Sequence, residues 1–261
     1  MTLRPFHIIL LCATVCCCSV KEDRSGCPCR LTIGLDEASD GEVILSAHNG
    51  SFFSSTTVSA RDWPFGFRMD VPVGLVTVTG IQGLKDNRMN DRNVIIDTGT
   101  DADRIFLYCN IIECYGEQAY DRARFHKNWT NLQILVGGYE DDWEFSHTVT
   151  GNVCGFSISD MTPLEGEFRC TAVKGDQDSP AYSLDLPRQT MPAEGLKLHI
   201  IRRSDNAAAM IYDLSEILDG YGFDWNKKNL DDIRISIDYS DFSIGVTILD
   251  WEDGDETQIT I

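Results

Sequence analysis

Short runs in which apolar and polar residues alternate occupy most of the chain from Leu31 onward. In the first half they fall at 31–35, 43–47, 65–73, 75–81, 94–96 and 104–112. In the second half they fall at 132–136, 144–153, 155–158, 166–173, 182–186, 195–201, 208–212, 230–238, 243–251 and 257–261. Clusters of Gly, Asn and Asp separate many of the runs, and short strands divided by turn residues are typical of β-sandwiches and β-barrels. Since only 213–218 has a helical pattern, the sequence predicts an all-β fold.

A mostly polar stretch at 116–128 interrupts the alternation near the middle of the chain. We place a domain boundary in this stretch. The result is two tandem β-sandwich domains, at 30–120 and 121–261, each long enough to bury a core of its own.

The first eighteen residues differ from the rest of the chain. Arg4 is their only charged residue, and the apolar run from Ile8 to Val15 is too short to cross a bilayer as a helix, which takes about 20 residues. A run of this length suits the apolar region of a secretory signal peptide. A buried N-terminal helix is the competing interpretation.

The apolar run ends in a cysteine cluster, and polar sequence begins directly after it. This order is typical of a bacterial lipoprotein signal, in which a cysteine receives the lipid and becomes the first residue. We therefore predict a signal peptide at 1–17 and a lipidated tether at 18–29. Cys18 is the predicted lipid site, and Cys17 and Cys16 are the alternatives.

The net charge excludes two classes of function. The chain has 41 acidic residues against 22 basic ones, a formal net charge of −19. Nucleic-acid binding needs Lys and Arg to replace phosphate counterions, so nucleic acid is excluded as a partner. Attachment to anionic lipid through a basic face is excluded for the same reason. Acyl chains, at about 0.8 kcal/mol per buried CH₂, are then the predicted means of holding the acidic body at a membrane.

Six cysteines follow the predicted lipid site: Cys27, Cys29, Cys109, Cys114, Cys154 and Cys170. An even number in an exported chain makes all six candidates for disulfides, and the sequence does not choose among the pairings. Structural zinc sites need CxxC-like pairs with histidine partners, which these spacings do not provide. The sequence therefore predicts no metal site.

The sequence offers no catalytic constellation. None of its five histidines lies in an HExxH motif or beside a candidate nucleophile, and G-x-S-x-G, P-loop and G-x-G-x-x-G motifs do not occur. The abundant carboxylates single out no catalytic pair. The acidic stretch 250–256 departs from the EF-hand pattern, which favours a solvated turn over a weak calcium site. We predict no catalytic residue and no cofactor.

Several segments, taken in order, resemble a known family. The segment SVKEDRSGCPCRLTI at 19–33 resembles the start of the mature FimB-type fimbrial anchor lipoproteins of Bacteroides-type bacteria. The tail resembles them at 221–225 (YGFDW), 230–233 (LDDI), 237–239 (IDY) and 250–251 (DW), and so do 186–189 (LPRQ) and the segment around Gly155. The extra signal cysteines, with Cys109, Cys114, Cys154 and Cys170, depart from the family pattern.

The resemblance implies two transthyretin-like β-sandwich domains, no enzymatic activity and a lipid anchor in the outer membrane, exposed at the cell surface. It also implies a place at the base of a fimbria, with the stalk subunit as partner. Charged residues at 21–23 resemble a surface-export signal, although a solvated linker explains them equally well.

Family fimbriae assemble by strand exchange, in which a C-terminal extension fills a groove in the neighbouring subunit. The resemblance therefore makes the C-terminal strands candidates for such pairing, with residues Ile244, Val246, Ile248, Ile259 and Ile261. The last segment, 257–261, is equally compatible with an edge strand of its own domain.

Two other functions remain open from the sequence. One is a surface glycan-binding lipoprotein that uses exposed tryptophans, and the other is a fimbrial tip adhesin of the same fold. The five tryptophans are either a sugar platform or core and rim residues, and their positions beside strand ends favour the second. Solvent exposure of Trp63, Trp143 and Trp251 separates the alternatives.

Overall fold

The computed structural model describes residues 26–35, 41–59, 66–90, 92–138, 144–175, 181–251 and, by backbone alone, 256–259. This part of the chain consists of strands and one short helix, which confirms the predicted all-β class. The predicted signal peptide at 1–17 and the lipid-site candidates Cys16, Cys17 and Cys18 lie outside the described residues.

The first sandwich pairs two sheets. One has the order β4-β1-β9, and β1 lies antiparallel to β4 but parallel to β9. The other is antiparallel with the order β10-β8-β5-β2-β3. The strands are β1 (Cys29–Leu35), β2 (Glu42–Asn49), β3 (Phe52–Ser59), β4 (Phe67–Val71), β5 (Gly74–Gln82), β8 (Phe106–Cys114), β9 (Gln118–Ala123) and β10 (His126–Lys127).

The second sandwich also pairs two sheets, with the orders β14-β15-β11-β18-β19-β20 and β17-β16-β12-β7-β6, and β13 pairs with β12. In the first of these sheets β11 and β18 run parallel, as β1 and β9 do in the other sandwich. The strands are β6 (Arg88–Asn90), β7 (Asn93–Ile95), β11 (Trp129–Gly137), β12 (Phe145–Ser157), β13 (Pro163–Thr171), β14 (Val173–Lys174), β15 (Ala181–Pro187), β16 (Lys197–Arg202), β17 (Ala207–Asp213), β18 (Asp232–Asp238), β19 (Ser243–Leu249) and β20 (Glu256–Ile259). The helix is α2 (Leu214–Gly220).

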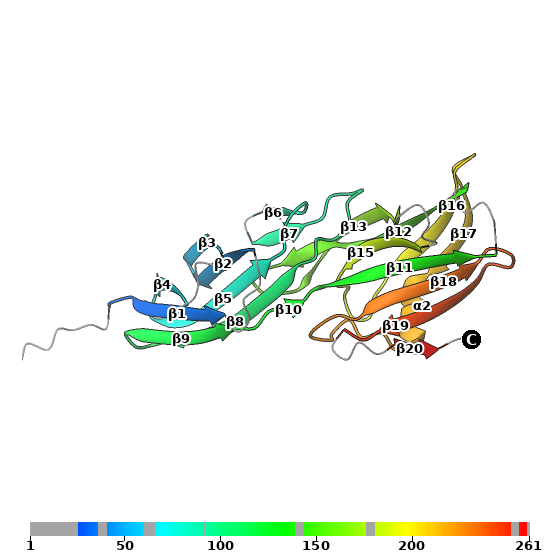
Figure 1. Cartoon of the computed structure of the whole chain (residues 1–261). Helices are drawn as coiled ribbons and strands as arrows, with labels where there is room; N and C mark the ends of the chain where they lie inside the picture. Colours follow the sequence, from blue (N-terminus) through cyan, green and yellow to red (C-terminus); the bar gives the residue numbers. More distant parts are fainter. Residues whose placement is uncertain are drawn as a thin grey trace, which may run out of the picture.

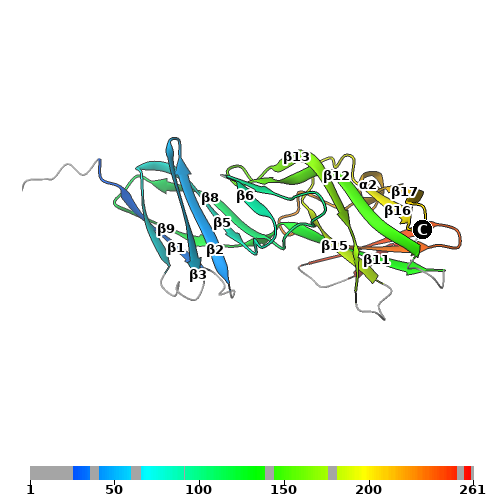
Figure 2. The ribbon, with the colours of Figure 1, turned by 90° about the horizontal axis from the view of Figure 1, so that it is seen from above.

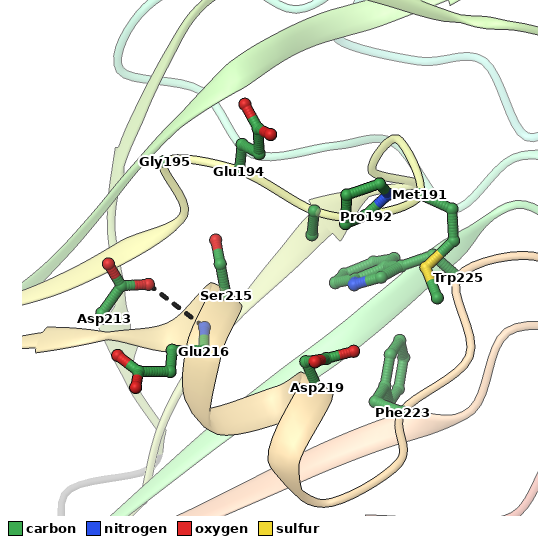
Figure 3. Close-up of a pocket in the computed structure, with 11 residues that line it drawn as sticks. Met191, Pro192, Glu194, Gly195, Asp213, Ser215, Glu216, Asp219, Phe223 and Trp225 are labelled. Atoms are coloured by element: carbon green, nitrogen blue, oxygen red, sulfur yellow. Dashed lines mark hydrogen bonds between the residues drawn. The ribbon is translucent and has the colours of Figure 1, made fainter.

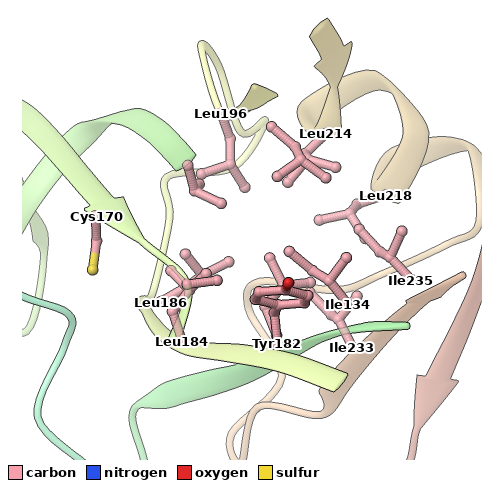
Figure 4. Packing of buried hydrophobic residues seen from close by; sticks show 14 of the residues in the cluster. Ile134, Cys170, Tyr182, Leu184, Leu186, Leu196, Leu214, Leu218, Ile233 and Ile235 are labelled. Carbon is pink, nitrogen blue, oxygen red and sulfur yellow. The ribbon is translucent and has the colours of Figure 1, made fainter. Parts of the chain in front are cut away.

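Alternation along the strands fills the space between the sheets. In the first sandwich Leu31 and Ile33 of β1 meet Val43 and Leu45 of β2, all at most 1% exposed. In the second, residues from β11, β15, β16, β18 and α2 converge on one core, which Figure 4 shows in part. Each sandwich thus has a core of its own.

A third apolar cluster joins the two sandwiches. It combines Ile81 of β5 and Leu107 of β8 with Val94 of β7 and Phe156 of β12. We call this the junction cluster. Figures 1 and 2 show the two sandwiches end to end, with β1 in the outer part of one and β20 in the outer part of the other.

Strands cross the junction in both directions. β6 and β7 precede β8 in sequence, yet β7 pairs with β12 of the second sandwich. Conversely β9 and β10 follow residue 117 and pair with β1 and β8 of the first. The division after residue 120 therefore stays a prediction, because strand pairing links both sides of it.

Gly155 is required where β12 meets β7. Its φ is +153°, and a Cβ built there would lie 1.9 Å from the carbonyl oxygen of Val94. The register of β12 against β13 also shifts on either side of Val153. The bend lets the long strand β12 contribute residues to both the second core and the junction cluster.

Four strand predictions were wrong. The polar stretch 116–128 contains β9 and β10, and β3 was not predicted at all. The Asn- and Asp-rich stretch 85–93, which separates two of the predicted runs, contains β6, and the runs 144–153 and 155–158 form the single strand β12. The missed strands β3, β6, β9 and β10 lie at sheet edges, where one face is solvated and the apolar alternation is weak.

Candidate functional site

The C-terminal edge of the second sandwich contains most of the predicted strand-exchange residues. Ile244, Val246 and Ile248 of β19 each stand directly opposite an isoleucine of β18. Val246 is buried, and the two isoleucines are half-buried against the second core. The two strands therefore share one apolar face, and cross-strand pairs of this kind stabilise a sheet.

β20 extends this sheet by one more strand. Its backbone pairs antiparallel with β19, placing Ile259 opposite Val246. Thus β19 has a hydrogen-bonded neighbour on both sides, and β20 is the outermost strand. Ile261 lies outside the described residues. A partner strand can add to the outer edge of β20, or β20 can leave β19 and pair with a partner's sheet.

A cluster of charges fixes the end of β19. The Lys227 Nζ lies 2.8 Å from a carboxylate oxygen of Asp231 and 2.8 Å from one of Asp250. These hydrogen bonds raise the pKa of Lys227, so the ammonium stays charged. Asp231 also accepts a hydrogen bond from the backbone N–H of Trp251 at 3.1 Å. These contacts therefore fix the position at which β19 ends.

Lys127 lies beneath Trp251 and is 1% exposed. Its Nζ is 4.6 Å from the Trp251 ring centroid and 5.1 Å from that of Trp129, within the range of cation–π contacts. It donates to Asp232 at 2.6 Å and to the Leu230 carbonyl at 2.8 Å. Burial lowers the pKa of Lys127, and Asp232 opposes that shift. β10 is thereby tied to β18.

Arg188 organises the neighbouring loop, directly after β15. Its guanidinium donates to the carbonyls of Trp225 at 2.5 Å and Lys227 at 2.8 Å, and to the Asn128 side chain at 2.8 Å. It also reaches the carbonyls of Lys127 and Lys228. Burial lowers the pKa of Arg188 to about 10, which leaves it cationic at neutral pH. A cavity of about 410 Å³ opens beside it at the junction.

A second cavity, of about 310 Å³, lies between the 191–195 loop and α2. Figure 3 shows Trp225 and Phe223 on one side of it and the side chains of Asp213, Glu216 and Asp219 around the helix. Asp213 caps α2 by accepting a hydrogen bond from the Glu216 N–H at 3.2 Å. Its carboxylate therefore has a structural role.

The Ser215 hydroxyl in this cavity accepts a hydrogen bond from the Leu196 N–H at 2.9 Å, and no histidine lines the cavity. Among these lining residues the Ser215 hydroxyl therefore has no histidine as a general base. In the part of the chain that the structure describes, no group of His, Cys, Asp and Glu side chains is arranged to hold a metal ion. Among the same residues, no helix has the length and apolarity to cross a bilayer.

The six candidate disulfide cysteines are free thiols in the structure. The structure brings Cys29 and Cys114 into the same apolar cluster, and both side chains are buried there. The others are apart: Cys170 stands opposite Val149 on β12, five positions from Cys154, and Cys27 and Cys109 are exposed.

Only one of the three tryptophans chosen to test glycan binding is described. Trp251 is 45% exposed, whereas Trp63 and Trp143 lie outside the described residues. Trp129 and Trp225 are 5% and 3% exposed, and both pack against other aromatic rings. Two of the three described tryptophans are thus core residues.

Lys127, Arg188 and Asp232 are the important residues that the sequence did not single out. Lys127 lies in a polar stretch, Arg188 follows the run 182–186, and Asp232 is one of the polar residues of the run 230–238. The LPRQ segment that contains Arg188 was noted for its resemblance alone. For Arg188 the one available signal was its position, a basic residue directly after the run 182–186.

Comparison with known proteins gives a consistent fold and little sequence similarity. No family model matches the chain, and no curated protein matches it. A structure described as candidate polysaccharide-binding proteins from Bacteroides thetaiotaomicron aligns with TM-score 0.65 and 9% identity, covering 89% of this chain and 98% of that one. The fimbrial anchor protein Mfa2 from Porphyromonas gingivalis aligns with TM-score 0.62 and 11% identity, covering 89% and 99%.

A candidate adhesin from Bacteroides thetaiotaomicron aligns with TM-score 0.61 and 15% identity, covering 91% of this chain and 100% of the other. All three alignments span both sandwiches. At these identities the likeness concerns the fold. The chain therefore has the two-sandwich architecture found in a fimbrial anchor protein and in candidate adhesins of these bacteria.

Proposed function

We propose that this chain is a non-enzymatic anchor or accessory subunit of a fimbria. It is held in the outer membrane by lipid on Cys18, exposed at the cell surface, and joined to the stalk subunit through its C-terminal sheet edge. The observation that supports the proposal is the placement of the first and last strands. β1, which follows the predicted tether in sequence, lies in the outer part of one sandwich, and β20 lies in the outer part of the other (Figure 1).

This placement suits a protein that links two objects. The acidic body carries a net charge of −19, so acyl chains supply the membrane affinity. The outer strand of the second sandwich offers main-chain hydrogen bonds to an incoming strand. The anchor protein with the same fold supports the fimbrial role.

Replacing Cys18 with alanine is expected to release the protein and its fimbriae from the cell. Acyl chains are lost with the thiol, and no basic face replaces them. The measurement is the amount of protein and of stalk subunit in membrane and culture fractions. Cys27→Ala is the matched control and keeps both cell-bound. Retention of the Cys18→Ala protein in the membrane contradicts this lipid site, and Cys17→Ala and Cys16→Ala then test the alternatives.

Deleting residues 256–261 is expected to keep the protein in the membrane but to abolish attachment of the stalk subunit. The deletion removes β20 and with it the outer edge at which a strand can add. Copurification of the stalk subunit with detergent-extracted protein measures this. Ile211→Lys is the control, because Ile211 lies on β17 at the edge of the other sheet and is 51% exposed. Undiminished copurification after the deletion rules out β20 as the contact.

Glycan binding is the second candidate. It is favoured by the exposed Trp251 and by the fold shared with candidate polysaccharide-binding proteins. Trp251→Ala separates the two functions, because it removes an exposed aromatic ring while the β20 backbone remains. Loss of binding to a glycan array with unchanged stalk attachment supports the second candidate.

A further inference from the structure

Cys29 and Cys114 meet at the end of the first sandwich where the tether enters. Cys29 is the first residue of β1 and Cys114 the last residue of β8, and both are 0% exposed in the same apolar cluster. Cys29 stands opposite Val71 on β4, while Cys114 stands opposite Gly74 on β5. The short β4–β5 connection therefore brings the two cysteines together from different sheets.

The two side chains interact with each other. Burial, and after it the neighbouring Cys29 side chain, raise the pKa of the Cys114 thiol to about 11. A thiol with a raised pKa reacts slowly, because the thiolate is the reactive form. Because both side chains are also buried, the Cys114 thiol reacts slowly with oxidants once the core has closed, and both cysteines are accessible while the chain is folding.

We propose that Cys29 and Cys114 form a disulfide in the exported protein, joining the tether end of β1 directly to β8. This inference rests on the export that the proposed function requires, since disulfides persist in oxidising compartments. The oxidant is a disulfide of a thiol oxidoreductase. One cysteine thiolate attacks that disulfide and releases the first thiol, and the second cysteine then displaces the other. Two protein thiols lose two electrons and two protons, and the oxidant becomes two thiols.

The remaining cysteines do not compete from the folded positions. Cys109 lies five residues before Cys114 on the same strand, and side chains at odd spacing point to opposite faces. Cys109 is exposed, as that alternation requires. Cys154 and Cys170 belong to β12 and β13 of the second sandwich. Cys27 is the nearest alternative partner, two residues before Cys29 and exposed.

The disulfide changes how a pulling force crosses the protein. Without it, tension on the tether acts on β1, whose hydrogen bonds to β4 and β9 can be broken one after another from Cys29 onward. With it, the force passes from Cys29 to the end of β8, and the 84 residues between the two cysteines are bypassed. The bond thereby protects the first sandwich from unravelling under load.

The test uses full-length protein extracted from membranes, blocked with N-ethylmaleimide and mapped by mass spectrometry without reductant. We expect a Cys29–Cys114 linked peptide, with these two thiols alkylated only after reduction. Cys29→Ser and Cys114→Ser each remove the linked peptide, whereas the control variants Cys109→Ser and Cys154→Ser keep it. A peptide linking Cys27 to Cys114 overturns the pairing.

Refolding purified protein with oxidised glutathione separates this inference from the proposed function. A bond that forms on refolding but is missing from cell-extracted protein supports the pairing and contradicts export. A bond missing in both overturns the inference and leaves the anchor role intact. In single-molecule pulling between the termini, reduction should lengthen the unfolded chain by about 300 Å, from about 3.6 Å per residue. An unchanged length argues against the mechanical role.

Discussion

Replacing Arg188 with methionine is expected to lower the free energy of unfolding by about 3–5 kcal/mol, since hydrogen bonds to a charged group contribute about 1.5–3 kcal/mol each and buried acceptors lose their partner. Arg188 donates to four backbone carbonyls and to Asn128. Methionine fills similar space and donates nothing. Chemical denaturation measures the change.

The loss of stability in Arg188→Met should be visible in the neighbouring loop as well as in the free energy of unfolding of the whole protein. Hydrogen exchange is expected to accelerate in the 224–229 loop, where Arg188 holds the carbonyls of Trp225, Lys227 and Lys228. Arg188→Lys should recover part of the stability, because an ammonium lacks the planar fork that reaches several acceptors. The control is Arg203→Met, since Arg203 is exposed and its guanidinium donates to the Phe145 carbonyl at 3.1 Å. Equal effects at both sites disprove the organising role of Arg188.

Asp232→Ala is the second substitution with a large expected effect, about 3–5 kcal/mol of lost stability, because it leaves a buried charge without its partner. The Lys127 Nζ lies 2.6 Å from Asp232 and is 1% exposed. The same carboxylate accepts a hydrogen bond from the Asn131 N–H at 2.7 Å, which is lost too. Equilibrium denaturation of the single and double variants gives the coupling.

The double variant Lys127→Met with Asp232→Leu should be much closer to the wild type, because an apolar pair carries no desolvation cost. Asp70→Ala is the surface control. Asp70 pairs with Arg30 at 3.4 Å with both side chains more than half exposed, so it should lose at most about 1 kcal/mol. A double variant as unstable as Asp232→Ala contradicts the assignment of the effect to an unpaired charge.

The pH dependence of the Asp232→Ala variant offers an independent readout. Burial already lowers the pKa of Lys127 from its usual 10.5, and loss of Asp232 lowers it further. Between the lowered pKa of Lys127 in the folded chain and its usual 10.5, the unfolded chain binds more protons than the folded one, so stability rises with pH through that window. The rise should be steeper in the variant than in the wild type.

The strands that the sequence predicted best are those with both a buried and a solvated face. β18 and β19 alternate isoleucine or valine with polar residues, and the structure places those residues as expected. β9 was missed because it is an edge strand, with Tyr120 63% exposed and Ala119 as its apolar partner on the other face. Its parallel pairing with β1 joins segments far apart in sequence. Periodicity cannot indicate that contact.

The polar contacts at the junction could not be predicted from the sequence, for a related reason. Lys127 lies in a polar stretch of the sequence. Its burial depends on Trp129, two residues further on, and on Trp251 and Asp232, which come from distant segments. The pairing of the cysteines could not be predicted from the sequence either. Their number indicated disulfides, but only the three-dimensional fold brings Cys29 and Cys114 into one buried cluster.

The crossing strands at the junction restrict how this architecture can be recombined. A cut between residues 96 and 117 would leave β7 without β12 on one product, and β1 without β9. A fusion that exchanges one sandwich for a homologous one must therefore also exchange the segments that reach across the junction. Gene segments encoding either half are not interchangeable modules, so the two sandwiches are expected to be inherited together as one unit.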